Sequence, residues 1–160
     1  MKQFFVLLFA ISVMACSGGD PAPTPTPTPP TPTVSVATLV KKVWTASSVQ
    51  WDGVTKYDKS STSNVVQGYS QYKLDLSTAG SVTLTEFDGK IFTGTYTVAT
   101  DGLSLTLSGL TSAEGAPTGT GGTIIYTILA TPTATGLSLQ QSTAYVKASS
   151  AIVKLALVNP

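Results

Sequence analysis

Few residues of this chain carry side chains that enzymes use for acid–base or nucleophilic chemistry. The 160 residues contain no His, no Arg and a single Cys. A Ser-His-Asp triad, a metal site built from His and Cys, and a disulfide within the chain are therefore excluded. The carboxylates Glu86 and Asp88 lie close together in sequence, but calcium needs about six or more oxygen ligands and Asp88 precedes a turn glycine. We expect this pair to be structural.

Two further motifs match functional patterns but lack the element that the chemistry needs. Ser70 and Lys73 fit the S-x-x-K string of penicillin-binding enzymes, which requires both side chains on one helix face. On a strand, residues three apart point to opposite faces. The glycine-rich run 111–122 precedes a strand, not the helix N-terminus that a phosphate cradle needs. We expect neither enzymatic activity nor a cofactor.

The charge pattern argues against a nucleic-acid partner. The formal net charge is +1, and the nine lysines are scattered along the chain. A nucleic-acid-binding surface requires clustered positive charge. Charged residues make up only 11% of the chain, against about a quarter in an ordinary soluble domain. The polar character comes instead from Ser, Thr and Gly.

The first sixteen residues resemble the signal sequence of a bacterial lipoprotein. Lys2 supplies a positive start, and residues 4–13 are continuously apolar. A helix from there to Cys16 would be about 20 Å long, and a bilayer core is about 30 Å thick. The stretch therefore indicates a signal peptide, not a membrane span. It ends in VMAC at 13–16, which is similar to the lipobox.

The lipobox resemblance implies a lipid anchor at Cys16. In that family the signal peptide, here residues 1–15, is removed, the cysteine thiol receives diacylglycerol, and the new amino terminus is acylated, for example with palmitate. An ordinary secretory signal with an incidental cysteine is the alternative. Ser17, where inner-membrane lipoproteins carry Asp, favours the outer membrane, with the side of that membrane left open. Loss of Lys2 leaves eight lysines against eight acidic residues, so lipid alone would hold the protein.

A proline-rich linker follows over residues 16–35. The run 20–33 alternates Pro with Thr and holds seven of the ten prolines. Proline fixes φ and lacks an N–H, so this run is expected to be a polyproline II spacer with a reach of roughly 50 Å. Plain disordered sequence is the alternative, and the threonines would permit O-glycosylation.

Residues 36–160 are expected to form one all-β domain. Apolar and polar residues alternate with period two, and Asp-Gly pairs at 88–89 and 101–102 predict tight hairpins. The expected strands are 42–51, 69–76, 81–87, 91–98, 103–107, 123–130, 137–141 and 151–158. Closure removes exposed edges, so we expect an eight-stranded antiparallel up-and-down barrel, with a β-sandwich as the alternative.

Laid out in this way, the domain resembles the lipocalin-like domains of Bacteroidetes envelope lipoproteins. The likeness rests on four segments: LVKKVWT at 39–45, WDG at 51–53, the hairpin at 81–98, and DGLSLTL at 101–107. The resemblance implies a cup-shaped barrel with an apolar interior, but no particular ligand. We expect this interior to bind a small apolar or amphiphilic molecule, or none. Lys42 replaces the family's glycine, and Lys154 is the candidate for a cation that in lipocalins packs over the tryptophan. Alternation points Lys154 away from the interior.

Seven aromatic residues are the candidate ligand contacts. Five are expected inside the barrel, and two at its rim: Trp44, Tyr72, Phe92, Tyr96 and Tyr126 inside, Trp51 and Tyr57 at the rim. Ordinary core packing is the alternative for the first five. The polar run Asp52–Gly68 is expected to be either a lid or a solvated loop. The rival function is an interaction module with a packed core that contacts an envelope protein or a glycan.

Overall fold

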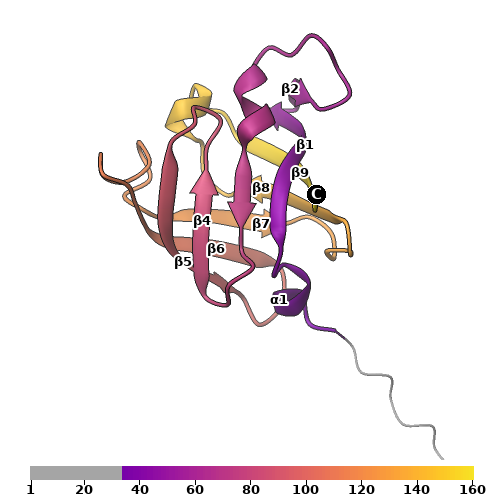
Figure 1. Ribbon diagram of the computed structural model, residues 1–160, viewed down its shortest axis with the longest axis vertical. Helices are drawn as coiled ribbons and strands as arrows, with labels where there is room; N and C mark the ends of the chain where they lie inside the picture. The colour runs from indigo at the N-terminus through magenta and orange to yellow at the C-terminus, as the bar shows by residue number, and fades with distance from the viewer. Residues whose placement is uncertain (1–33) are drawn as a thin grey trace, which may run out of the picture. The chain divides into compact units, whose positions relative to one another are not determined.

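The computed structural model describes residues 34–160, which are mostly strands joined by turns (Figure 1). The elements are α1 (Val36–Leu39), β1 (Val43–Trp51), β2 (Val54–Asp58), the 3₁₀ turn η1 (Gln67–Gln71), β3 (Lys73–Asp75), β4 (Ser81–Thr85), β5 (Ile91–Val98), β6 (Ser104–Thr111), β7 (Ile124–Ile128), β8 (Gly136–Gln141), the 3₁₀ turn η2 (Val146–Ala148) and β9 (Val153–Val158). The predicted signal peptide, the Cys16 anchor and the linker as far as residue 33 lie outside the described residues. Between residues 34 and 160, no helix has the length and apolar character to cross a membrane.

Nine strands form one antiparallel sheet, and all of them except β2 close into a barrel. Consecutive strands pair from β3 to β9, and β9 pairs back with β1 from Thr45↔Val158 to Trp51↔Val153. This closure confirms the eight-stranded up-and-down barrel and excludes the sandwich. It is the strand number and connectivity of lipocalin-like barrels.

The extra strand β2 lies where the sequence predicted only a loop. The first half of β1 pairs with β3, and its second half pairs with β2 through a hairpin at Asp52 and Gly53. Both turn residues have positive φ, at 47° and 81°, as a type I′ turn requires. The prediction of an unbroken polar loop over Asp52–Gly68 is therefore wrong at 54–58. The pairing edge of β1 beyond β3 is free, and the hairpin fills it.

The expected strand at 69–76 is also partly wrong, because its first residues form η1. Gly68 lies against the β4–β5 hairpin so closely that a Cβ there would lie 2.0 Å from the carbonyl oxygen of Phe87. This contact leaves no room for a straight strand, and β3 is confined to 73–75. Tyr72, Leu74 and Leu76 are nevertheless all buried, which explains why the alternation looked like one strand. Ser70 and Lys73 are exposed and lie on different elements.

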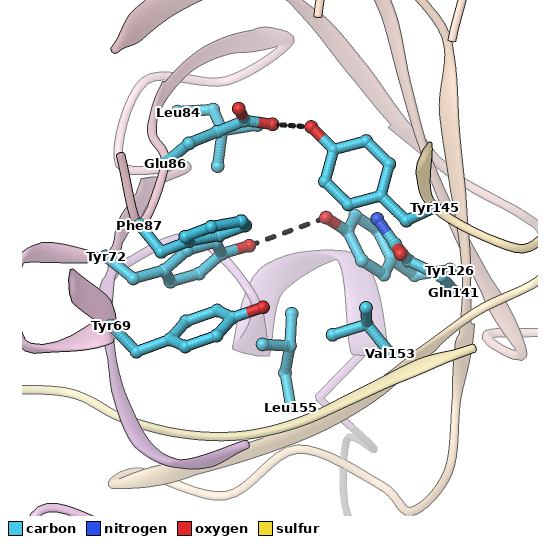
Figure 2. Close-up of a pocket in the computed structure, with 10 residues that line it drawn as sticks. All are labelled: Tyr69, Tyr72, Leu84, Glu86, Phe87, Tyr126, Gln141, Tyr145, Val153 and Leu155. Carbon is cyan, nitrogen blue, oxygen red and sulfur yellow. Dashed lines mark hydrogen bonds between the residues drawn. The ribbon is translucent and has the colours of Figure 1, made fainter. Parts of the chain in front are cut away.

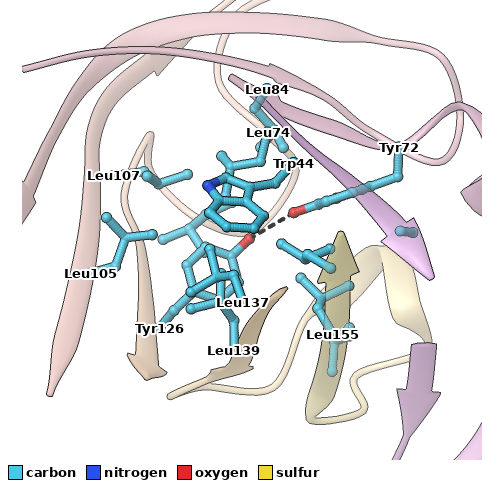
Figure 3. Close-up of a cluster of buried hydrophobic side chains, with 14 of the residues drawn as sticks. Trp44, Tyr72, Leu74, Leu84, Leu105, Leu107, Tyr126, Leu137, Leu139 and Leu155 are labelled. Atoms are coloured by element: carbon cyan, nitrogen blue, oxygen red, sulfur yellow. Dashed lines mark hydrogen bonds between the residues drawn. The ribbon is translucent and has the colours of Figure 1, made fainter. Parts of the chain in front are cut away.

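The inside of the barrel is filled by large apolar side chains (Figure 3). The side chains that meet there are Trp44, Leu74, Leu84, Leu105, Leu107, Tyr126, Leu137, Leu139 and Leu155. All of them are almost entirely shielded from solvent. Burying each large apolar side chain stabilises the fold by about 1.5–3 kcal/mol, so this packing is the main source of barrel stability.

One end of the barrel is closed by α1. The indole N–H of Trp44 donates to the carbonyl oxygen of Val40, which follows α1, at 2.8 Å. Ser35 caps the helix by accepting from the backbone N–H of Thr38 at 3.3 Å. Lys42 Nζ lies 5.8 Å from the centre of the Trp44 ring. Lys154 is exposed on β9, so the alternation placed it correctly.

Candidate functional site

The barrel end away from α1, called the mouth below, is covered by three connections. These are η1, the β4–β5 hairpin at 86–90, and the segment 142–152 between β8 and β9 (Figure 1). The glycine-rich 112–123 connection lies beside them, because Gly119 packs directly against Val146. Loops from opposite parts of the sequence therefore meet at the mouth.

Beneath these connections, aromatic and polar side chains line a small space of about 10 Å³, called the void below. Its lining residues are Tyr69, Tyr72, Leu84, Glu86, Phe87, Tyr126, Gln141, Tyr145, Val153 and Leu155. Figure 2 shows the Tyr69, Tyr72 and Phe87 rings reaching in from one side and meeting Tyr126 and Tyr145 from the other. A void of this size has room for about one water molecule. It is not a preformed cavity for a larger ligand.

A buried carboxylate forms the centre of the mouth. Glu86 is only 2% exposed, and its two oxygens accept hydrogen bonds from the hydroxyl of Tyr145 and from Nζ of Lys147. Lys147 also donates to Asp88 Oδ2 at 2.7 Å. The other Asp88 oxygen accepts from the backbone N–H of Lys90 at 3.1 Å, which is the turn role that the sequence predicted. The pair of carboxylates is thus bound to this chain's own groups.

The cluster changes the acidity of its members. Burial alone would lower the pKa of Lys147, but its hydrogen bonds to Asp88 and Glu86 outweigh burial and raise that pKa. Burial alone would raise the pKa of Asp88, and the hydrogen bond from Lys147 lowers it overall. Burial and the neighbouring Glu86 carboxylate raise the pKa of Tyr145 far above its ordinary value. At neutral pH, Lys147 is therefore charged and Tyr145 is a neutral donor.

The remaining tyrosines of the mouth are held as neutral phenols. The hydroxyls of Tyr72 and Tyr126 lie 3.4 Å apart. Burial raises the pKa of Tyr126 to about 12 and that of Tyr72 well above its ordinary value. The hydroxyl of Tyr69 accepts from the indole N–H of Trp51 at 2.9 Å. Neutral phenols of this kind donate hydrogen bonds without adding charge.

Gln141, at the end of β8, differs from the residues above in its hydrogen bonding. Its side chain is 5% exposed, and among the described residues its Oε1 has no hydrogen-bond partner. An unpaired buried polar atom costs about 1–3 kcal/mol of stability. Gln141 also borders an open groove of about 220 Å³. The groove is lined by Gly119, Thr120, Thr123, Ile124, Ile125, Gln141, Thr143, Ala144 and Tyr145.

Only two of the seven aromatic residues proposed from sequence line the void at the mouth, Tyr72 and Tyr126. Trp44 lies deeper, in the packed interior. Phe92 and Tyr96 are also buried, but Tyr96 bonds to the carbonyl oxygen of Leu76 at 3.1 Å and neither lines the void.

The two residues proposed for the rim pack around Tyr69. The ring centres of Trp51 and Tyr57 lie 6.5 Å and 6.2 Å from that of Tyr69. Trp51 also contacts Phe87, with ring centres 6.1 Å apart. Both therefore support the mouth from outside the void.

Besides the rings of Tyr69 and Phe87, four residues of this site were not among the candidates from the sequence: Glu86 as a buried group, Gln141, Tyr145 and Lys147. The sequence contained a pattern that identifies Glu86 and Gln141. Glu86 is in phase with the inward-facing Val82 and Leu84, and Gln141 is in phase with Leu137 and Leu139. A polar residue on the apolar face of a strand marks a buried polar group. No comparable pattern identifies Tyr145 or Lys147, which lie on a connection.

The described part of the chain offers no donor set for a metal. Among residues 34–160, no group of three or more His, Cys, Asp or Glu side chains is placed to hold an ion. The oxygens of Glu86 and Asp88 are occupied by Tyr145, Lys147 and Lys90. The chemistry of the mouth is therefore hydrogen bonding by neutral groups around one internal ion-pair cluster.

Comparison with known proteins finds likeness in structure only. No protein-family model matches the chain, and no curated protein matches it in sequence. A lipocalin-like protein from Bacteroides uniformis is similar, with a TM-score of 0.48 and 14% identity over 76% of this chain and 99% of that one. An uncharacterized protein from Bacteroides eggerthii is similar with a TM-score of 0.44 and 13% identity, over 74% and 98% of the two chains.

Proposed function

We propose that the protein is a non-catalytic binding protein of the cell envelope, held to the outer membrane by lipid on Cys16, that takes a small ligand at the barrel mouth. The observation that carries the binding proposal is the unpartnered Oε1 of Gln141. Almost every buried polar atom in a folded protein has a hydrogen-bond partner. A ligand that donates to this oxygen would recover the stability that its burial costs.

The filled interior supports the mouth, not the barrel centre, as the binding place. Preformed ligand cavities in proteins measure about 300–1,000 Å³. The void at the mouth is about 10 Å³, and the space below it is occupied by leucines and Trp44. A hydrophobic ligand deep in the barrel would have to displace these side chains. The small apolar ligand expected from the sequence is for that reason not the one we favour.

Native mass spectrometry tests the binding proposal. The full-length chain, purified in a zwitterionic detergent, should retain a small molecule that appears as a fixed added mass. Gln141→Leu should lose it, since leucine has a similar size and no polar atom. Gln140→Leu is the matched control, because Gln140 lies on the outer face of β8. Equal retention by the Gln141→Leu variant, or no retained molecule in any variant, would contradict binding at the mouth.

Metabolic labelling tests the anchor separately. Cys16→Ala should abolish incorporation of an alkyne-tagged palmitate and move the protein from the membrane to the soluble fraction. Ser17→Ala should change neither, since it leaves the thiol in place. If the Cys16→Ala protein is still labelled and still sediments with membranes, the lipoprotein assignment is wrong.

The second candidate function is an interaction module that contacts an envelope protein or a glycan through its loops. The packed interior favours it, because a barrel without a cavity serves as a rigid support (Figure 3). Val54 and Val65 are exposed near the mouth and offer contact area. Binding that survives Gln141→Leu and fails when Val65 is changed to Asp would select this function over the first.

A further inference from the structure

We propose that the ligand is a neutral, hydroxyl-bearing ring of about the size of one sugar unit, seated in the groove between the start of β7 and residues 141–145. There, one ligand hydroxyl donates to Gln141 Oε1. This inference rests on the proposed binding function and adds the chemical class of ligand and the place where it lies.

The size of the groove sets the size of the ligand. Its volume is about 220 Å³, below the roughly 300 Å³ at which pockets for drug-sized molecules begin. A single ring fits this space. A long acyl chain does not, because the groove does not continue into the filled barrel: the void behind it is only about 10 Å³.

The position of Gln141 explains how a ligand in the groove reaches a buried oxygen. Gln141 and Tyr145 line both the groove and the void, so these two residues form the wall between them. Figure 2 shows the Gln141 amide beside the Tyr126 ring and close to Tyr145. If Tyr145 turns aside, its bond to Glu86 breaks, but Glu86 keeps Lys147 as a partner. The wall can therefore open without leaving an unpaired buried charge.

The groove presents neutral polar groups together with an apolar floor. Thr123 and Thr143 line it and contribute neutral hydroxyl groups. Ile124 and Ile125 supply apolar surface beside the ring of Tyr145. A sugar ring has the complementary features, since it carries hydroxyls around its edge and C–H groups on its faces.

The charges near the groove disfavour an anionic ligand. The lining contains no lysine. The nearby charged cluster has two carboxylates, Glu86 and Asp88, which share Lys147 as their cation. The excess charge is negative, so carboxylates and phosphates are repelled. An anionic ligand such as a fatty acid is therefore disfavoured.

Chemical-shift mapping by NMR tests this inference on the full-length chain in a zwitterionic detergent that has no sugar headgroup. The probes are glucose, galactose and N-acetylglucosamine as neutral rings, glucuronate as the charged counterpart, and laurate as the apolar chain. At least one neutral ring should shift the backbone amides of 119–125 and 141–145. Glucuronate should bind at least about tenfold more weakly, a difference of about 1.4 kcal/mol. Laurate should shift none of these amides.

Two variants make the result specific. Gln141→Leu should weaken binding of the neutral ring about tenfold, and Gln140→Leu should leave it unchanged. Thr143→Ala, at an exposed position, should weaken it less. If laurate shifts these amides and the shift depends on Gln141, the proposed ligand class is wrong. The proposed binding function would still hold. If the neutral ring binds the Gln141→Leu variant as tightly as the unchanged protein, the proposed site is wrong. Failure of every neutral ring, with a retained molecule still present in mass spectrometry, would overturn the inference alone.

Discussion

At the scale of single residues, the mouth is organised around a carboxylate that water hardly reaches. Glu86 is tolerated there because Tyr145 and Lys147 both donate to it. A buried charge that loses its partner is strongly destabilising, whereas an exposed ion pair contributes little. Within residues 34–160, both kinds of pair occur on neighbouring loops: Lys147 pairs with the buried Glu86, and Lys90 forms an exposed bridge with Glu114.

The first prediction compares these two lysines. Lys147→Met removes the cation from Glu86 and should lower the free energy of unfolding by about 3 kcal/mol. Lys90→Met should lower it by less than about 1 kcal/mol, since the side chains of that pair are 47% and 70% exposed. Urea unfolding followed by tryptophan fluorescence measures both. Equal effects of the two substitutions would show that Lys147 does not compensate a buried charge.

The second prediction concerns alkaline pH. The folded-state pKa values of Tyr69, Tyr72, Tyr126 and Tyr145 are raised, chiefly by burial, above the ordinary 10.0. Above pH 10 the unfolded chain therefore binds fewer protons than the folded chain, and stability falls as pH rises. Below pH 10 this contribution is constant. The free energy of unfolding should fall by about 1.4 kcal/mol per pH unit for each tyrosine still protonated in the folded state.

Unfolding in urea between pH 8 and pH 12 measures that slope, and tyrosinate absorbance of the folded protein measures the ionisation directly. The pKa of Tyr126 is raised to about 12, so Tyr126→Phe should make the fall with pH less steep between pH 10 and pH 12. Complete ionisation of the tyrosines near pH 10 in the folded protein would contradict the account.

Only some of the residues at the site could be predicted from the sequence, and the reason is physical. Period-two alternation assigns a face to every residue of a strand, so the burial of Tyr72, Tyr126 and Glu86 follows from their neighbours. Alternation says nothing about which loops meet at a barrel end. Tyr145 and Lys147 reach Glu86 across 59 and 61 positions of sequence, and the closed barrel alone brings them together.

At the scale of elements, β1 is the strand that joins the barrel to its mouth. It pairs with β9 on one side and with both β3 and β2 on the other. The segment that follows β2 returns to the barrel through Gly68, whose contact with Phe87 positions η1 and hence the rings of Tyr69 and Tyr72.

The third prediction tests this contact. Gly68→Ala places a methyl group 2.0 Å from a backbone oxygen, so η1 must move away from the β4–β5 hairpin. We expect a loss of stability of about 1–3 kcal/mol and a change in Trp51 fluorescence, because Trp51 bonds to Tyr69. Gly136→Ala is the control, since its Cβ would meet only the side chain of Thr133, at 3.3 Å. An unchanged Trp51 signal in Gly68→Ala would show that η1 is not held by this contact.

The elements themselves were predictable where hairpins are regular. The strand expected at 91–98 has those bounds in the structure, because the Asp-Gly turns on either side fix its ends. The strand at 54–58 was missed, because its five residues show no alternating apolar face and only Tyr57 among them is buried. It forms only because β1 extends beyond β3 and offers an edge, which is a tertiary effect.

At the scale of the whole domain, eight strands close a barrel that is filled from α1 up to the mouth. The proposed binding surface lies at the mouth, and a solid core lies beneath it. The two tryptophans lie at these two depths. Trp44 is in the core, with its indole N–H bonded to Val40, and Trp51 is at the mouth, bonded to Tyr69.

The indole N–H signals of these two tryptophans, followed by ¹H–¹⁵N NMR as a neutral sugar is added, test the central claim most directly. The Trp51 signal should shift in a saturable way, because Trp51 bonds to Tyr69, and Tyr69 lines the void together with Gln141 and Tyr145, the two residues that the ligand in the groove contacts. The Trp44 signal should stay in place. A saturable shift of Trp44 as large as that of Trp51 would mean that the ligand enters the barrel core, and the account would be wrong.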